Sequence, residues 1–195
     1  FGWNRTQLSL ALSFTRVEGG ILGPIEGYLV DRFGTKRMVL IGMIIMGFGW
    51  IVFSRINHLL IFYFAYLVIA LGQGLGSWLA LNTMMNNWFV RRRSFAMGLS
   101  NSLSRFGALF FVPLLAWLVD PEFLDRPGWS LTAFILGIVT ILLALPLTSL
   151  LRNKPEDYGL LPDGDTEEDV ERRNKEAAIT GVKIEQEYDF TVSQA

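Results

Sequence analysis

The 195-residue sequence contains no cysteine and only one histidine. The absence of cysteine excludes disulfides, zinc–thiolate sites and cysteine nucleophiles. The single histidine, His58, falls in a short polar turn, so the sequence lacks the clustered His, Cys and carboxylate ligands of a metal-dependent active site. We therefore expect neither an enzyme nor a bound cofactor.

Charged residues are also scarce: they make up 18% of the chain, and 51% of the residues are hydrophobic. Soluble domains carry about 25% charged residues. The charge is unevenly divided, because residues 1–151 hold eleven Lys/Arg and six Asp/Glu, whereas residues 152–195 hold six and twelve. An apolar, basic body thus precedes an acidic tail, without a basic surface large enough to indicate nucleic-acid binding.

Five apolar runs are long enough to cross a bilayer core of about 30 Å, which takes about 20 helical residues. Backbone polar groups must be satisfied within the bilayer, so continuous runs of this length predict helices rather than the shorter, alternating strands of a barrel. The expected fold is an all-α membrane protein with a helical half-domain over residues 1–151 and an acidic loop over residues 152–195. The predicted spans are residues 8–30, 38–54, 59–81, 95–119 and 129–151.

Positive charge orients these spans. Residues 31–37, 91–93 and 152–154 fall on alternate connections and together hold eight Lys/Arg, against three on the opposite side. Lys and Arg concentrate in cytoplasmic loops. We therefore expect the N-terminus of this chain outside and the acidic tail in the cytoplasm, where its composition predicts a solvated linker. Thr166 and Asp169 have the spacing of a helix capping box within it.

The loop at residues 27–37, which we call the signature loop, follows the pattern Gly-x-Leu-x-Asp-Arg-x-Gly-x-Lys/Arg-Lys/Arg. This pattern resembles the signature of the major facilitator superfamily, where it joins the second and third helices on the cytoplasmic side. The matching residues are Gly27, Leu29, Asp31, Arg32, Gly34, Lys36 and Arg37. The resemblance implies that the five spans are helices two to six of a twelve-helix transporter, and that this chain is a fragment lacking the first helix and the C-terminal half.

Three other segments resemble one branch of that family, the monocarboxylate porters and oxalate:formate antiporters. Residues 88–98 resemble the entry to its fifth helix, residues 1–5 the loop before its second helix, and residues 155–164 the segment after helix six in bacterial members. Drug:proton antiporters instead carry an arginine at the position of Ala70 and a Gly-Pro pair where Val112 and Pro113 stand. The branch implies an integral protein of the bacterial inner membrane.

The resemblance further implies that the signature loop is a conformational latch, in which Asp31 meets the positive N-terminal end of a helix in the other half. Such a latch would hold the outward-facing state. The alternative is a basic turn that only sets topology. The latch residues are Gly27, Asp31, Arg32, Gly34, Lys36 and Arg37.

Polar residues inside the spans are candidates for a substrate pathway, because they are costly there. Arg16 and Arg105 suit an anion, since guanidinium binds carboxylate with two parallel hydrogen bonds; the structural alternative is pairing with acidic residues or helix carbonyls. Glu18 and Glu26 are both candidate proton relays. Glu26 lies near the cytoplasmic end, where we expect it to pair with the basic loop, so Glu18 is the better candidate. The pathway candidates are Arg16, Glu18, Gln73, Asn101 and Arg105.

The sequence therefore predicts a secondary active transporter that works by alternating access in the lipid bilayer. Small organic anions such as monocarboxylates are the expected substrates, with possible proton coupling. A non-transporting membrane scaffold or sensor, with the acidic tail as its effector, and a transporter of an uncharged or other solute are the alternatives. Gly72, Gly74 and Gly76 form a small-residue strip that we expect to serve helix packing.

Overall fold

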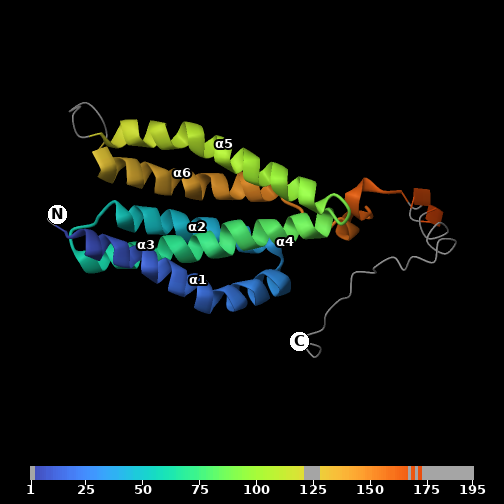
Figure 1. Cartoon of the computed structure of the whole chain (residues 1–195), viewed down its shortest axis with the longest axis horizontal. Coiled ribbons are helices and arrows are strands. Elements are labelled where there is room, and N and C mark those ends of the chain that lie inside the picture. Colours follow the sequence, from blue (N-terminus) through green and yellow to red (C-terminus); the bar gives the residue numbers. More distant parts are fainter. Residues whose placement is uncertain (1–2, 121–127, 167, 170, 173–195) are drawn as a thin grey trace.

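The computed structural model describes residues 3–120, 128–166, 168–169 and 171–172. Over these residues the chain is helical and contains no strand, which confirms the predicted all-α fold. The long helices run alongside one another, with the N-terminus at one end of the bundle and the segment after α6 at the other (Figure 1). The elements are α1 Arg5–Phe33, α2 Thr35–Phe53, α3 Leu59–Gln73, the π-helix η1 Gly74–Trp78, α4 Leu79–Trp88, α5 Arg93–Val119, α6 Gly128–Leu150, and the 3₁₀ turns η2 Glu156–Tyr158 and η3 Pro162–Gly164.

Among the described residues, four helical stretches are long and apolar enough to cross a membrane. They are Thr35–Phe53, Leu59–Trp88, Arg93–Val119 and Gly128–Leu150. Helix α1 has 29 residues, ample length for a span, but Arg16, Glu18 and Glu26 lower its hydropathy, so its crossing of the bilayer stays a prediction. The stretch from Leu59 runs seven residues beyond the predicted end at residue 81, because the helix continues through η1 and the asparagine-containing α4.

Helix α2 lies in the middle of the bundle and packs on its neighbours through glycines. A Cβ added to Gly42 would lie 2.4 Å from the backbone of Gly76, and one added to Gly72 would lie 2.4 Å from the backbone nitrogen of Met46. Only a hydrogen side chain lets two helix backbones approach this closely. Gly72 and Gly76 of the predicted small-residue strip therefore do serve helix packing.

Close packing at glycines also joins α2 to α6. A Cβ on Gly137 would lie 2.6 Å from the carbonyl oxygen of Gly47. At the C-terminal end of α2, the Ser130 hydroxyl donates a 2.6 Å hydrogen bond to the Ser54 carbonyl oxygen. We call these close contacts the glycine seam; its residues are Gly42, Gly47, Gly72, Gly76 and Gly137.

Helix α5 has different surroundings. It lies beside α6 (Figure 1), yet none of its 27 residues is buried. Large apolar side chains such as Phe106, Phe110 and Val112 are more than 60% exposed. In a membrane protein such a surface faces lipid or further protein, because hydrocarbon and protein interiors are about equally apolar.

Candidate functional site

The signature loop makes a tight connection between α1 and α2. Gly34 stands between the two helices with φ 84° and ψ 149°, a conformation that residues with a Cβ rarely adopt. A Cβ at this position would also lie 2.9 Å from the side-chain nitrogen of Asn153. Glycine is therefore required at position 34 both by the backbone angle and by the neighbouring side chain.

Within the part of the chain that the structure describes, the charged residues of the signature loop have few partners. Asp31 is exposed and, within the described residues, forms neither a hydrogen bond nor an ion pair. Arg32 is also exposed; its Nη1 donates a 2.8 Å hydrogen bond to the Tyr28 hydroxyl. Arg37 is exposed at the start of α2. The proposed partner of Asp31 would come from outside these residues, so the latch stays a prediction.

The segment that follows α6 is docked against the loops of the bundle, and we call residues 152–165 the strap. The backbone N–H of Lys36 donates to the Asn153 side-chain oxygen at 2.8 Å. The Trp88 indole N–H donates to the Arg152 carbonyl oxygen at 3.0 Å, and the Asn87 amide to the Asn153 carbonyl oxygen at 3.4 Å. The strap therefore joins the signature loop to the end of α4.

The far end of the strap binds the turn between α4 and α5. The Asp163 carboxylate accepts hydrogen bonds from the backbone N–H groups of Arg91, at 2.7 Å, and Arg92, at 3.3 Å. The Arg91 guanidinium also pairs with Asp165 at 3.1 Å. Partial burial acts to raise the pKa of Asp163, but backbone hydrogen bonds from Arg91, Arg92 and Val90, with the charge of Arg91, outweigh it and lower the pKa below its ordinary value.

The docked strap corrects the prediction that the tail begins as a solvated linker. The missed signal was charge complementarity: Asp163 and Asp165 follow the basic turn at Arg91 and Arg92 by about 70 residues, and only the fold brings them together. Further along, the predicted capping box is present, because the Asp169 N–H donates to the Thr166 hydroxyl at 3.3 Å. The rest of the predicted tail helix and the tail at 173–195 lie outside the described residues.

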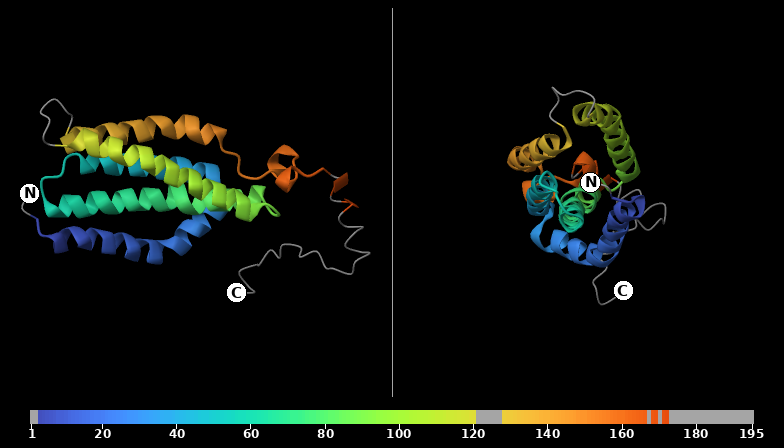
Figure 2. Two further views of the ribbon diagram at one scale, coloured as in Figure 1. Left: turned by 45° about the horizontal axis from the view of Figure 1, so that its top comes forward. Right: turned by 90° about the vertical axis from the view of Figure 1, so that its left-hand side faces the viewer.

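The pathway candidates lie on α1, α3 and α5. Arg16 and Arg105 are exposed and, in the part of the chain that the structure describes, neither is in an ion pair. In the end-on view, α5 and the first part of α1 lie toward the side of the bundle opposite α2 (Figure 2). Glu18 is half-buried, and Gln73 and Asn101 are exposed. The structure thus shows no contact that joins these candidates into one site.

Glu26 differs from its predicted role. Its side chain is only 5% exposed, and its Oε1 is fully buried without a hydrogen-bond partner. The carboxylate lies against Gly74 of η1, where an added Cβ would be 2.5 Å from Oε1. Within the described residues it makes no ion pair with the basic loop, so the expected pairing is wrong. The helix carries Glu26 inward, on the face that also holds buried Val30.

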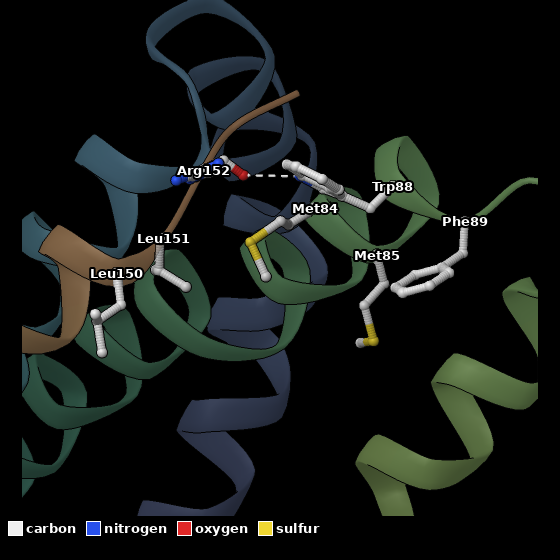
Figure 3. A pocket seen from close by; sticks show the side chains of 7 residues that line it. All are labelled: Met84, Met85, Trp88, Phe89, Leu150, Leu151 and Arg152. Atoms are coloured by element: carbon white, nitrogen blue, oxygen red, sulfur yellow. Dashed lines mark hydrogen bonds between the residues drawn. The ribbon is translucent and has the colours of Figure 1, made fainter. Parts of the chain in front are cut away.

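One apolar cavity of about 310 Å³ lies beside the strap (Figure 3). Trp88, whose indole donates to the Arg152 carbonyl, lies on one side of it, and the Arg152 guanidinium stacks 4.5 Å from the Tyr158 ring. No group of three or more His, Asp or Glu that could hold a metal forms among the described residues. The cavity is lined by Met84, Met85, Trp88, Phe89, Leu150, Leu151 and Arg152.

Long apolar helices joined by short, partly basic turns define an all-helical integral membrane protein. A profile of the Major Facilitator Superfamily matches residues 1–184, so the chain belongs to that family. This confirms the membership inferred from the signature loop.

Several curated relatives are similar to parts of this chain. The oxalate:formate antiporter of Oxalobacter formigenes is 30% identical over 121 residues, which are 62% of this chain and 28% of the relative. Human monocarboxylate transporter 14 is 28% identical, over 77% of this chain and 28% of the relative. A probable L-galactonate transporter of Escherichia coli is 27% identical, over 78% and 33%. The chain thus spans about a third of the length of these relatives.

Proposed function

We propose that this chain is part of a secondary active transporter that moves small organic anions, such as monocarboxylates, by alternating access. The observation that carries the proposal is the family membership over residues 1–184, combined with relatives named for oxalate, formate, monocarboxylate and L-galactonate. The sites of such transporters lie near the bilayer midplane between two helical halves. No enzymatic step is part of the proposal.

Arg16 and Arg105 support an anionic substrate. Each lies within a long helix, each is exposed, and each is without an ion-pair partner among the described residues. A guanidinium in a membrane helix is costly unless it faces a polar cavity or a partner. A substrate carboxylate would supply that partner through two parallel hydrogen bonds.

The orientation is part of the same proposal. The signature loop, the turn at Arg91 to Arg93 and the strap lie at one end of the bundle (Figure 1), and Lys and Arg concentrate on the cytoplasmic side. We place this end in the cytoplasm of a bacterial cell. Asp31, exposed there, is available as the latch residue toward a helix of the other half.

Uptake of a labelled monocarboxylate by proteoliposomes containing the full-length protein tests the substrate assignment. We expect Arg16→Ala and Arg105→Ala each to lower uptake about tenfold or more, because a charge-assisted hydrogen bond contributes about 1.5–3 kcal/mol. Arg55→Ala is the matched control, since Arg55 is an exposed arginine in the turn after α2. Uptake that is unchanged in both helix variants would show that these arginines do not bind substrate.

A further inference from the structure

Glu26 is a buried acidic residue that is not among the candidates for the substrate pathway. Glu26 is 5% exposed, its Oε1 is buried without a hydrogen-bond partner, and its carboxyl lies against Gly74 at the start of η1. An ionised carboxylate removed from water without a partner costs several kcal/mol. Such a group is stable in this packing when it carries a proton, and becomes an anion when water reaches it.

The backbone around Glu26 is shaped to receive the carboxyl. Gly74 is the first residue of η1. A Cβ added to Gly74 would lie 2.5 Å from Oε1 and 2.6 Å from Oε2 of Glu26, too close for either contact. Any larger residue would push the carboxyl away. The helix also widens to a π-helix from this residue on, and single π-turns of this kind occur frequently at functional sites.

The charged groups around Glu26 leave it without a counter-ion. On α1 these are Glu18, two turns earlier, and Asp31 and Arg32 at the helix end. On α2 they are Lys36 and Arg37 in the first turn.

None of these side chains forms an ion pair with Glu26 among the described residues, and the backbone N–H of Lys36 is bound to the strap. Residues 59–88, which form α3, η1 and α4, contain no Asp, Glu, Lys, Arg or His. The two tyrosines of this stretch, Tyr63 and Tyr66, belong to or pack against a separate cluster around Phe62.

We propose that Glu26 is a proton-binding site of this half, occupied while its carboxyl is enclosed against Gly74 and emptied when α1 and η1 separate. On emptying, the O–H bond of the carboxyl breaks, the proton passes to water, and the hydrated carboxylate remains. This rests on the proposed alternating access and deepens it, because it assigns the coupling proton to Glu26 in place of Glu18. Pro24 lies inside α1, two residues before Glu26. An interior proline removes a backbone hydrogen bond and permits the helix to bend at this point.

Infrared spectroscopy of the full-length protein tests the proton site without any substrate. A protonated carboxylic acid has its own carbonyl stretching band, and we expect Glu26→Gln to remove one such band. Glu18→Gln is the matched control on the same helix and should leave that band in place. A spectrum in which Glu26→Gln removes no such band would overturn the proposal, even if the protein transports normally.

Proton flux then tests the coupling. In proteoliposomes with a pH-sensitive dye, we expect Glu26→Gln to lose proton movement during uptake of labelled monocarboxylate while it retains substrate exchange. Asp157→Asn, which changes an exposed carboxylate of the strap, should keep both. Proton flux that persists in Glu26→Gln would overturn the coupling role. Absence of uptake by the wild-type protein would contradict the proposed function alone, because the infrared result stands without it.

Gly74→Ala provides a second variant if Glu26→Gln does not fold. The added methyl group displaces the carboxyl without changing any charge, so we expect the infrared band to shift or disappear. Gly107→Ala on α5, where no atom lies within 4 Å of the added Cβ, is its control. An unchanged band in Gly74→Ala would contradict the enclosure of the Glu26 carboxyl by η1.

Discussion

The glycine seam and the exposed surfaces of α1 and α5 are built from opposite kinds of contact. In the seam, an added Cβ at Gly42 would lie 2.4 Å from a neighbouring backbone, so the helices meet without side chains between them. On α5 no residue is buried, and Gly98 and Gly107 have no atom within 4 Å of an added Cβ. The glycine seam is therefore packed against other helices of this chain, whereas the surfaces of α1 and α5 are exposed.

The difference separates the residues that hold this chain's helices together from those that we propose to work in transport. The seam is held by close contacts between helix backbones, and the strap by hydrogen bonds to the loops of the bundle. Arg16, Asp31 and Arg105 are all exposed, and none has an ion-pair partner in the described part of the chain. Residues of a moving interface or of a substrate path must exchange partners, so they are not fixed to their own half.

The largest effect on stability should come from the seam. We expect Gly42→Ala to lower the free energy of unfolding by about 1–3 kcal/mol, because the methyl group would overlap the backbone of Gly76 and force α2 and η1 apart. Gly107→Ala on α5 should be neutral or stabilise by up to about 1 kcal/mol, since alanine favours helix. Denaturant unfolding in detergent measures both variants, and equal effects would show that the seam is not more closely packed than α5.

A smaller effect should come from the strap, which holds the start of α5. We expect Asp163→Asn to cost at most about 1 kcal/mol, because the carboxylate accepts hydrogen bonds from Arg91 and Arg92 at a partly exposed site. Hydrogen exchange at these two amides should speed up, while exchange in α2 stays the same. Asp157→Asn, an exposed strap residue, is the control.

The strap effect should depend on pH with a defined sign. The pKa of Asp163 is lowered on folding, so its stabilisation is fully present above the unfolded value of about 3.9 and is lost as pH falls through the folded value. Wild type and Asp163→Asn should therefore differ at neutral pH and converge well below about pH 4. A difference that grows on acidification would contradict this assignment.

The smallest effect on stability should come from the latch. We expect Asp31→Asn to change the free energy of unfolding by less than about 0.5 kcal/mol, because Asp31 is exposed and unpaired among the described residues. It should still lower the population of the outward-facing state in the full-length protein. Accessibility labelling of the outer cavity measures that population, and unaltered labelling would rule out the dipole contact.

Much of the fold follows from local pattern. The apolar runs long enough for a bilayer coincide closely with helices α2, α3, α5 and α6. They predict helices because backbone N–H and C=O groups in hydrocarbon must form hydrogen bonds with one another. The helical stretch from Leu59 extends beyond the predicted span, because α4 continues the helix through its asparagines to Trp88. Length and hydropathy measure each segment alone, so they miss a helix that extends past its apolar part.

The sequence by itself determined the family, the helical class and the position of the signature loop, since these depend on residue order and local composition. Only the tertiary structure decided that Glu26 faces Gly74 and that Asp163 meets the turn at Arg91. Both contacts join residues far apart in the chain, and hydropathy carries no information on which helix faces meet. The burial of the Glu26 carboxyl and the hydrogen bonds of the Asp163 carboxylate both depend on how the helices pack. Local sequence pattern does not specify that packing.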